Sequence, residues 1–174
     1  GISASAGNDV EGRHPQIVQL AHGKAERVLE LGQPLGQPIV LYELGHEPVR
    51  LVRSTSPDDV ASVRWDPAAE TIDDGALDNI DAVVHLAGES IASSRWTDAQ
   101  KARIMDSRVK GTRTLATAMA AAKNPPAIFL SGSAIGYYGT SSDQRFVESS
   151  PSGSDFLASL CSRWEAAAAA VPSA

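Results

Sequence analysis

The stretch Asp81-Ala-Val-Val-His-Leu-Ala-Gly-Glu-Ser90 decides the fold class of this chain. Its apolar run with two β-branched valines is typical of a short strand that is buried on both faces of a sheet. The run ends in Ala87-Gly88, where the lack of bulky side chains lets a flat ligand approach the backbone. In open α/β sheets, ligands bind in the crevice beyond the carboxyl ends of the strands. This stretch alone therefore predicts either a nucleotide site or an ordinary buried strand followed by a turn.

Length, composition and charge place the chain in a broad class. It has 174 residues, of which 43% are hydrophobic and 21% are charged, as expected of one water-soluble domain. The net charge of −6 argues against nucleic acid as a partner, because phosphate binding needs a basic surface. No apolar run approaches the roughly 20 residues that span a bilayer, so no membrane partner is expected. With Cys161 as its one cysteine and no signal-peptide pattern at the start, we expect a cytoplasmic protein without a metal site.

Further apolar runs predict a parallel sheet around this first strand. We expect strands at residues 49–53, at residues 63–65 and, after a proline pair, at residues 127–130. A weaker apolar run at residues 16–21 is the candidate for the first strand of the sheet. If it were absent, the centre of the sheet would expose unpaired backbone groups.

Two helices are expected to alternate with these strands. Thr97 and Gln100 form a capping-box pattern, which predicts the start of a long helix. A second helix should begin near Ser154 and carry Trp164 on its inward face. Alternating strands and helices imply right-handed crossovers, and therefore a doubly wound α/β sheet. Residues 166–174 stop as the second helix finishes, so we expect the sheet to be incomplete at this end.

A series of motifs from about residue 36 to residue 170 carries a family resemblance. They include Gly45-His-Glu47, the stretch at residues 81–92, Ser131-Gly-Ser-Ala-Ile-Gly-Tyr-Tyr-Gly139 and Trp164-Glu165. In this order and spacing they resemble an atypical branch of the extended short-chain dehydrogenase/reductase superfamily, the nucleoside-diphosphate-sugar epimerase-like (SulA-type) family. The resemblance implies a partial NAD(P)-binding Rossmann-type domain over residues 36–174. Residues 1–35 form an N-terminal segment outside the match.

The phosphate-binding loop is where the chain departs most from this family. In the family a strand runs into a Gly-x-x-Gly-x-x-Gly turn, whose backbone N–H groups meet the pyrophosphate. The matching residues 32–38 hold only Gly32 and Gly36, and their two prolines lack N–H donors. Gly36 is therefore the candidate phosphate contact, and a linker that binds nothing is the alternative that we favour. The strand before this loop would be residues 16–21, unless the N-terminal third is foreign to the fold.

The resemblance also assigns the other cofactor contacts. Arg53 closes the second strand, where an arginine suits the 2′-phosphate of NADP by charge and by fork geometry. We therefore expect NADP to be preferred and NAD to remain an alternative, while an ordinary surface arginine is the plainer interpretation. Leu86, Ala87 and Gly88 should lie against the adenosine side, and Ser131 should lie near the nicotinamide.

The expected catalytic set is incomplete. In the related enzymes a serine at the end of this strand bonds the reacting oxygen, and here that serine is Ser133 or Ser131. A tyrosine then transfers the proton, and a lysine four residues later lowers its pKa. These two positions fall on Leu157 and Cys161, neither of which can perform that step.

Other polar residues near the strand ends have plainer interpretations. Tyr138, or its neighbour Tyr137, is a candidate proton donor, although a packing or cofactor-contact role is favoured for both. Arg108 stands where the family has an asparagine. The strand-end His85 is expected to be a hydrogen-bonded structural residue rather than a base.

Three functions remain open from the sequence. The first is an NADP-preferring epimerase/dehydratase-like oxidoreductase that acts on a sugar-like or small carbonyl substrate. The second is a non-catalytic dinucleotide-binding or regulatory module, and the third is an inactive fragment of a longer protein. An incomplete sheet edge would also favour association into a homo-oligomer.

Overall fold

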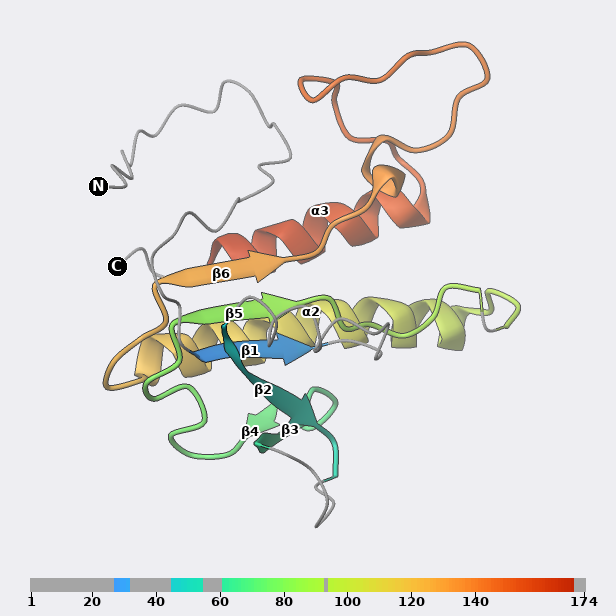
Figure 1. Cartoon of the computed structure of the whole chain (residues 1–174). Helices are drawn as coiled ribbons and strands as arrows, with labels where there is room; N and C mark the ends of the chain where they lie inside the picture. Colours follow the sequence, from blue (N-terminus) through green and yellow to red (C-terminus); the bar gives the residue numbers. More distant parts are fainter. Residues whose placement is uncertain (1–26, 32–44, 55–60, 93, 171–174) are drawn as a thin grey trace.

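The computed structural model describes residues 27–31, 45–54, 61–92 and 94–170. These residues form a six-stranded sheet together with two helices and one short 3-10 turn (Figure 1). In chain order the elements are β1 (Arg27–Leu31), β2 (Glu47–Val52), β3 (Ser62–Asp66), β4 (Thr71–Ile72), β5 (Ala82–His85), α2 (Asp98–Ala121), β6 (Ile128–Ser131), η1 (Ile135–Tyr138) and α3 (Phe156–Ala169).

The strand order confirms the predicted doubly wound sheet. The order is β4-β3-β2-β1-β5-β6, and every neighbouring pair is parallel except β3 with the edge strand β4. The chain first builds outward from β1 through β2 and β3, and then returns to the other side of β1 with β5 and β6. The strand order therefore reverses between β1 and β5, which is the position where open α/β sheets bind their ligands.

The central strand is not the one that the sequence favoured. β1 lies between β2 and β5, and its Leu29 is in register with Val49 on one side and Val83 on the other. The expectation that residues 16–21 fill this position is wrong, since residues 27–31 occupy it. Two charged residues interrupt the apolar pattern of β1, which weakens its sequence signal. Residues 16–21 themselves, and the loop at residues 32–38, lie outside the described residues.

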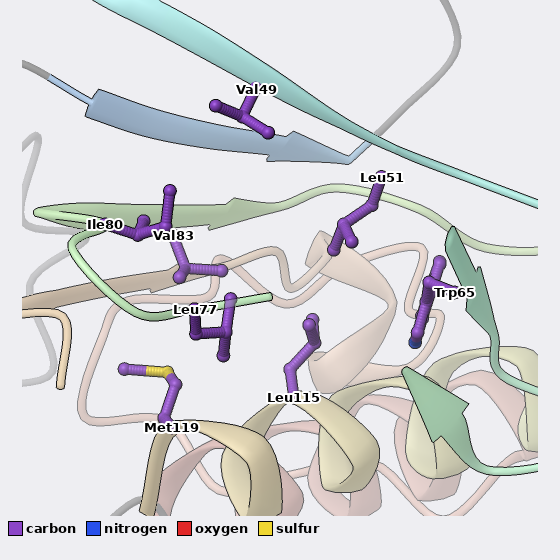
Figure 2. Packing of buried hydrophobic residues seen from close by; sticks show 8 residues of the cluster. All are labelled: Val49, Leu51, Trp65, Leu77, Ile80, Val83, Leu115 and Met119. Atoms are coloured by element: carbon purple, nitrogen blue, oxygen red, sulfur yellow. The ribbon is translucent and has the colours of Figure 1, made fainter. Parts of the chain in front are cut away.

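One face of the sheet is covered by α2 and α3, which also pack against each other (Figure 1). The core beneath α2 joins side chains from the sheet, from the turn before β5 and from the helix (Figure 2). Its buried members are Val49, Leu51, Trp65, Leu77, Ile80, Val83, Leu115 and Met119. Because side chains alternate along a strand, His85 points to the same face as Val83. Within the described ranges, no helix combines the length and the hydropathy that crossing a bilayer requires.

Both helices begin at a side-chain cap close to the predicted positions. Thr97 Oγ1 accepts the backbone N–H of Gln100 at 3.2 Å, and Asp155 Oδ1 accepts the N–H of Ala158 at 2.8 Å. The backbone N–H of Thr97, which a capping box directs to the residue at position 100, donates to the carbonyl of Arg95 at 2.9 Å. Gln100 turns its amide toward Glu89 instead, at 3.4 Å, so the helix start is tied to the loop that follows β5.

Candidate functional site

The loop after β5 begins at the point where the strand order reverses. The last residue pair between β1 and β5 is Leu31 with His85, so residues 86–88 follow directly beside the carboxyl end of the central strand. Leu86 is 59% exposed, Ala87 is half-buried and Gly88 is exposed. The structure therefore places these three predicted cofactor contacts together at the expected edge, where Leu86 and Gly88 face solvent.

Gly88 lies directly on a side chain of α2. A Cβ at this position would stand 2.7 Å from Arg108 Cζ, so any other residue would force the guanidinium to move. Arg108 Nη1 donates to the carbonyl oxygen of Glu89 at 2.9 Å and to that of Ile104 at 3.3 Å. The guanidinium carbon also lies 5.2 Å from the centre of the Trp164 ring on α3.

The same loop is held from a second direction by Ser107. The backbone N–H of Glu89 donates to Ser107 Oγ at 2.9 Å, and that hydroxyl donates in turn to the carbonyl of Ile104 at 3.0 Å. Both backbone groups of Glu89 are therefore bound by consecutive residues of α2. A loop fixed in this way presents a preformed surface, which lowers the cost of ordering it around a ligand.

The end of β6 lies next to this loop. Ser131 is in register with His85, and the backbone N–H of Gly132 donates to the carbonyl of His85 at 2.9 Å. Gly132 also lies against Trp164, because a Cβ there would be 2.9 Å from Cη2 of the indole. The exposed Ser133 follows, and its hydroxyl donates to Glu165 Oε1 at 2.6 Å. The structure thus brings Ser131 and Ser133 to the same edge as residues 86–88.

Both tyrosines make aromatic contacts. Tyr138 stacks on Phe146 with ring centres 5.4 Å apart and planes 14° apart, and it meets Tyr137 edge-on at 5.2 Å. The carbonyl of Tyr137 accepts the N–H of Gly153, which ties η1 to the loop before α3. Of the two roles expected for both residues, packing and cofactor contact, these contacts favour packing.

The predicted cofactor contact Arg53 lies on the other side of β1. Arg53 follows the last residue of β2 and is exposed, so it stands at the carboxyl edge of the sheet. β2 is the neighbour of β1, which places Arg53 across the central strand from the loop after β5. Gly36 lies outside the described residues.

His85 is a core residue and not a group available to substrate. It is fully buried between Trp65 and Trp164, whose ring centres lie 5.9 and 6.4 Å away. Burial, together with the charge of Arg108, lowers the pKa of His85 from 6.5 to about 4. Neither ring nitrogen finds a hydrogen-bond partner in the part of the chain that the structure describes, so the expected hydrogen bond is not formed. His85 is therefore neutral near pH 7, and it packs beneath the carboxyl edge of the sheet.

Sequence reasoning missed the residues that support the site. Arg108 was noted only as a departure from the family, and Trp164 only as an inward-facing residue. Ser107 and Glu165 had no assigned role. The signal that could have found Ser107 and Arg108 is the clustering of polar residues in the first half of the helix that follows β5, whereas no comparable signal marks Trp164 and Glu165 on α3.

The parallel sheet, its reversal point and the small-residue loops at its carboxyl edge define a Rossmann-type α/β protein. Residues 40–159 match the NAD dependent epimerase/dehydratase family, and the chain belongs to this family. An epimerase family protein of Mycobacterium bovis is 39% identical over 122 residues, which are 70% of this chain and 40% of that protein.

Two solved structures extend the comparison to the fold. The human epimerase family protein SDR39U1, crystallised with NADPH, has a TM-score of 0.67 at 30% identity and covers 82% of this chain and 48% of its own. The nucleoside-diphosphate sugar epimerase of Corynebacterium glutamicum has a TM-score of 0.65 at 34% identity, over 83% of this chain and 30% of its own. The chain therefore spans less than half the length of these relatives.

Proposed function

We propose that this chain is the dinucleotide-binding part of an NADP-preferring, epimerase/dehydratase-like oxidoreductase with a sugar-like or small carbonyl substrate. The observation that carries the proposal is the loop at residues 86–89. It stands at the reversal point of the sheet, it exposes Leu86 and the backbone of Gly88 to solvent, and α2 holds both backbone groups of Glu89. Family membership supports a nicotinamide dinucleotide as the ligand, as does the NADPH in the related human structure.

The preference for NADP rests on Arg53. Its exposed guanidinium at the end of β2 matches the position from which a 2′-phosphate is bound in this type of fold. The variant R53Q should weaken NADPH binding by about tenfold, the size of one lost charge-assisted hydrogen bond, and leave NADH binding unchanged. R64Q, which removes an exposed arginine from β3, is the matched control. Equal losses for both dinucleotides in R53Q would exclude the preference.

The reacting group that we favour is Ser133. Because its hydroxyl donates to Glu165, its oxygen is left free to accept a hydrogen bond from a substrate hydroxyl. In this arrangement a substrate proton can move toward the Glu165 carboxylate through Ser133. The nicotinamide, when bound, supplies the hydride chemistry. Tyr138 remains the second candidate for proton transfer.

The second candidate function is binding without turnover. The two positions that carry tyrosine and lysine in related enzymes are here apolar or buried. Leu157 packs on Gly136, and Cys161 is 2% exposed with its thiol directed at the Ala134 carbonyl at 3.6 Å. Burial raises the pKa of Cys161, so the thiol stays protonated and inert at neutral pH.

One set of titrations separates these functions. NADPH and NADH are titrated against the chain by fluorescence and by thermal shift, and turnover is then followed on a panel of carbonyl compounds and sugar nucleotides. Turnover that is lost in S133A supports the oxidoreductase. Binding with no turnover supports the binding module, and no shift with either dinucleotide at millimolar concentration excludes both.

A further inference from the structure

Arg108 and Trp164 lie stacked beneath two loops of the candidate site. We propose that they act as a positioning pair. The pair fixes the backbone positions of the loops after β5 and β6 together, and these positions determine the affinity for the dinucleotide. The inference rests on the proposed function for its ligand. The loop coupling that it predicts is measurable on the protein without ligand.

The first contact of the pair is with the loop after β5. The guanidinium of Arg108 packs against Gly88 so closely that a Cβ at Gly88 would stand 2.7 Å from Arg108 Cζ. The same guanidinium holds the Glu89 carbonyl at 2.9 Å. A guanidinium that moves away therefore gives up the Glu89 carbonyl and leaves the backbone of Gly88 without the side chain that packs against it.

The second contact is with the loop after β6. A Cβ at Gly132 would stand 2.9 Å from the Trp164 indole, so the backbone rests directly on the ring. The residue after each of these two continues the contact, since the Ser133 hydroxyl donates to Glu165 Oε1 at 2.6 Å. The position of Trp164 therefore sets the backbone that carries the candidate reacting serine.

The stack joins these two contacts into one unit. The Arg108 guanidinium lies over the Trp164 ring at 5.2 Å, in reach of a cation–π interaction that strengthens as the charge is desolvated. Arg108 is half-buried. A lysine could not reproduce this arrangement, because its ammonium lacks the planar fork that both stacks on the ring and bonds the carbonyl.

The pair therefore predicts an effect that crosses from one loop to the other. R108K should speed amide exchange of Glu89, which is near the lost contact, and also of Gly132, which Arg108 does not contact. W164L should likewise speed exchange at both amides, whereas W164F, which keeps a ring beneath the arginine, should restore most of the protection at each. The amide of Arg50, which donates to the carbonyl of Ala61 in a distant part of the sheet, reports any global loss of stability. Its change in exchange rate is subtracted from the changes at Glu89 and Gly132.

Dinucleotide affinity gives the second measurement, through a double-mutant cycle. G88A should weaken NADPH binding by up to about tenfold, since the new methyl group pushes the guanidinium away from the Glu89 carbonyl and the Trp164 ring. R108A removes that collision, so G88A should cost several-fold less in the R108A background than in the wild type. R113A, which removes an exposed arginine farther along α2, is the matched control and should show no coupling to G88A.

The outcomes separate this inference from the proposed function. If the wild type binds neither dinucleotide, the proposed function fails, and the exchange results still decide whether the loops are coupled. Effects confined to the loop nearest each substitution would overturn the positioning pair, and so would additive losses of affinity in the cycle. Cross-loop exchange together with non-additive affinities would establish it.

Discussion

Among single residues, His85 shows most clearly how the core and the site are linked. It lies beneath the loop after β5, between Trp65 and Trp164, and it is fully buried. Its pKa is lowered to about 4, mainly by burial and further by Arg108. The neutral ring is therefore part of the folded state, and a proton on it would be placed next to the positive charge of the half-buried Arg108.

This lowered pKa predicts a loss of stability in mild acid. Above the unfolded pKa of 6.5 both states are neutral at this residue, and no stability depends on it. As the pH falls toward 4, the unfolded chain binds the proton first and stability is lost. Between pH 7 and pH 5 the free energy of unfolding in urea should fall by about 2 kcal/mol through His85 alone.

The variant H85F isolates this contribution. An aromatic ring keeps the contacts with both tryptophans but takes up no proton, so its stability should depend less on pH by that amount. H46F, which changes a histidine outside the buried core, should keep the wild-type dependence. If H85F lost as much unfolding free energy between pH 7 and pH 5 as the wild type, another group would be responsible for the loss of stability in acid.

For each contact in the site, one of the two residues could be identified from the sequence, but its partner could not. Gly88 and Ser133 stand out because they follow apolar strands, where small and polar residues mark a ligand edge. Their partners could not be predicted. Arg108 meets Glu89 across 19 residues and Glu165 meets Ser133 across 32, so each pairing depends on how a helix crosses the sheet.

At the level of elements, the start of α2 connects a local sequence signal to the site. Thr97 caps the helix by accepting the Gln100 N–H, and Gln100 reaches the Glu89 side chain in the loop after β5. T97A should lower the free energy of unfolding by about 1 kcal/mol, the usual cost of a lost N-cap. Urea titration measures this change, with T97S retaining most of the stability.

A matched substitution away from any helix start provides the control. Thr140 is exposed and lies in a loop, so T140A should leave stability nearly unchanged. If T97A and T140A had equal effects, the cap would contribute nothing to the fold.

The segment before α3 depends on a close crossing of two backbones. A Cβ at Gly153 would stand 2.8 Å from the Cα and N of Gly139 and from the carbonyl of Tyr138. Backbone atoms cannot move aside as a flexible side chain can, so G153A should destabilise the protein by about 1–3 kcal/mol. Thermal unfolding tests this, and the exposed neighbour variant S152A should behave as the wild type. A neutral G153A would mean that the two loops do not cross in solution.

How well each element can be predicted depends on how clearly its apolar residues alternate with polar ones or form a continuous run. β2, β3, β5 and β6 lie within one or two residues of their predicted positions, since each has an apolar run bounded by turn residues. β1 was misplaced because charges interrupt its pattern. β4 was missed because two residues carry no periodicity, and its strand exists only through antiparallel pairing with β3.

For the whole molecule, the class of fold could be predicted and the contents of its site only in part. The strand order and the reversal between β1 and β5 follow from alternating strands and helices together with right-handed crossovers. The family resemblance added the ligand class. The substrate could not be predicted, because specificity depends on groups that converge from several segments, and the chain spans less than half of its relatives.

A hollow in another part of the molecule tests whether the carboxyl edge is correctly chosen as the dinucleotide site. It has a volume of about 840 Å³ and lies between β4, the turn before β5 and the later turns of α2. Its charged lining residues include Glu70, Asp73, Asp74, Asp78, Arg113 and Lys123. The segments that lead into β5 and β6 line it, so it lies toward the opposite ends of these strands. Its mainly acidic lining would repel a pyrophosphate.

Amide hydrogen exchange with and without NADPH tests the central claim most directly. We predict that saturating NADPH slows exchange at residues 86–90 and 131–134, because the dinucleotide lies over the loops that follow β5 and β6. Exchange at residues 70–78 and 117–123, around the hollow beside β4, should not change. Protection confined to that hollow, or no protection anywhere at millimolar NADPH, would contradict the assignment of a dinucleotide site to the carboxyl edge of this sheet.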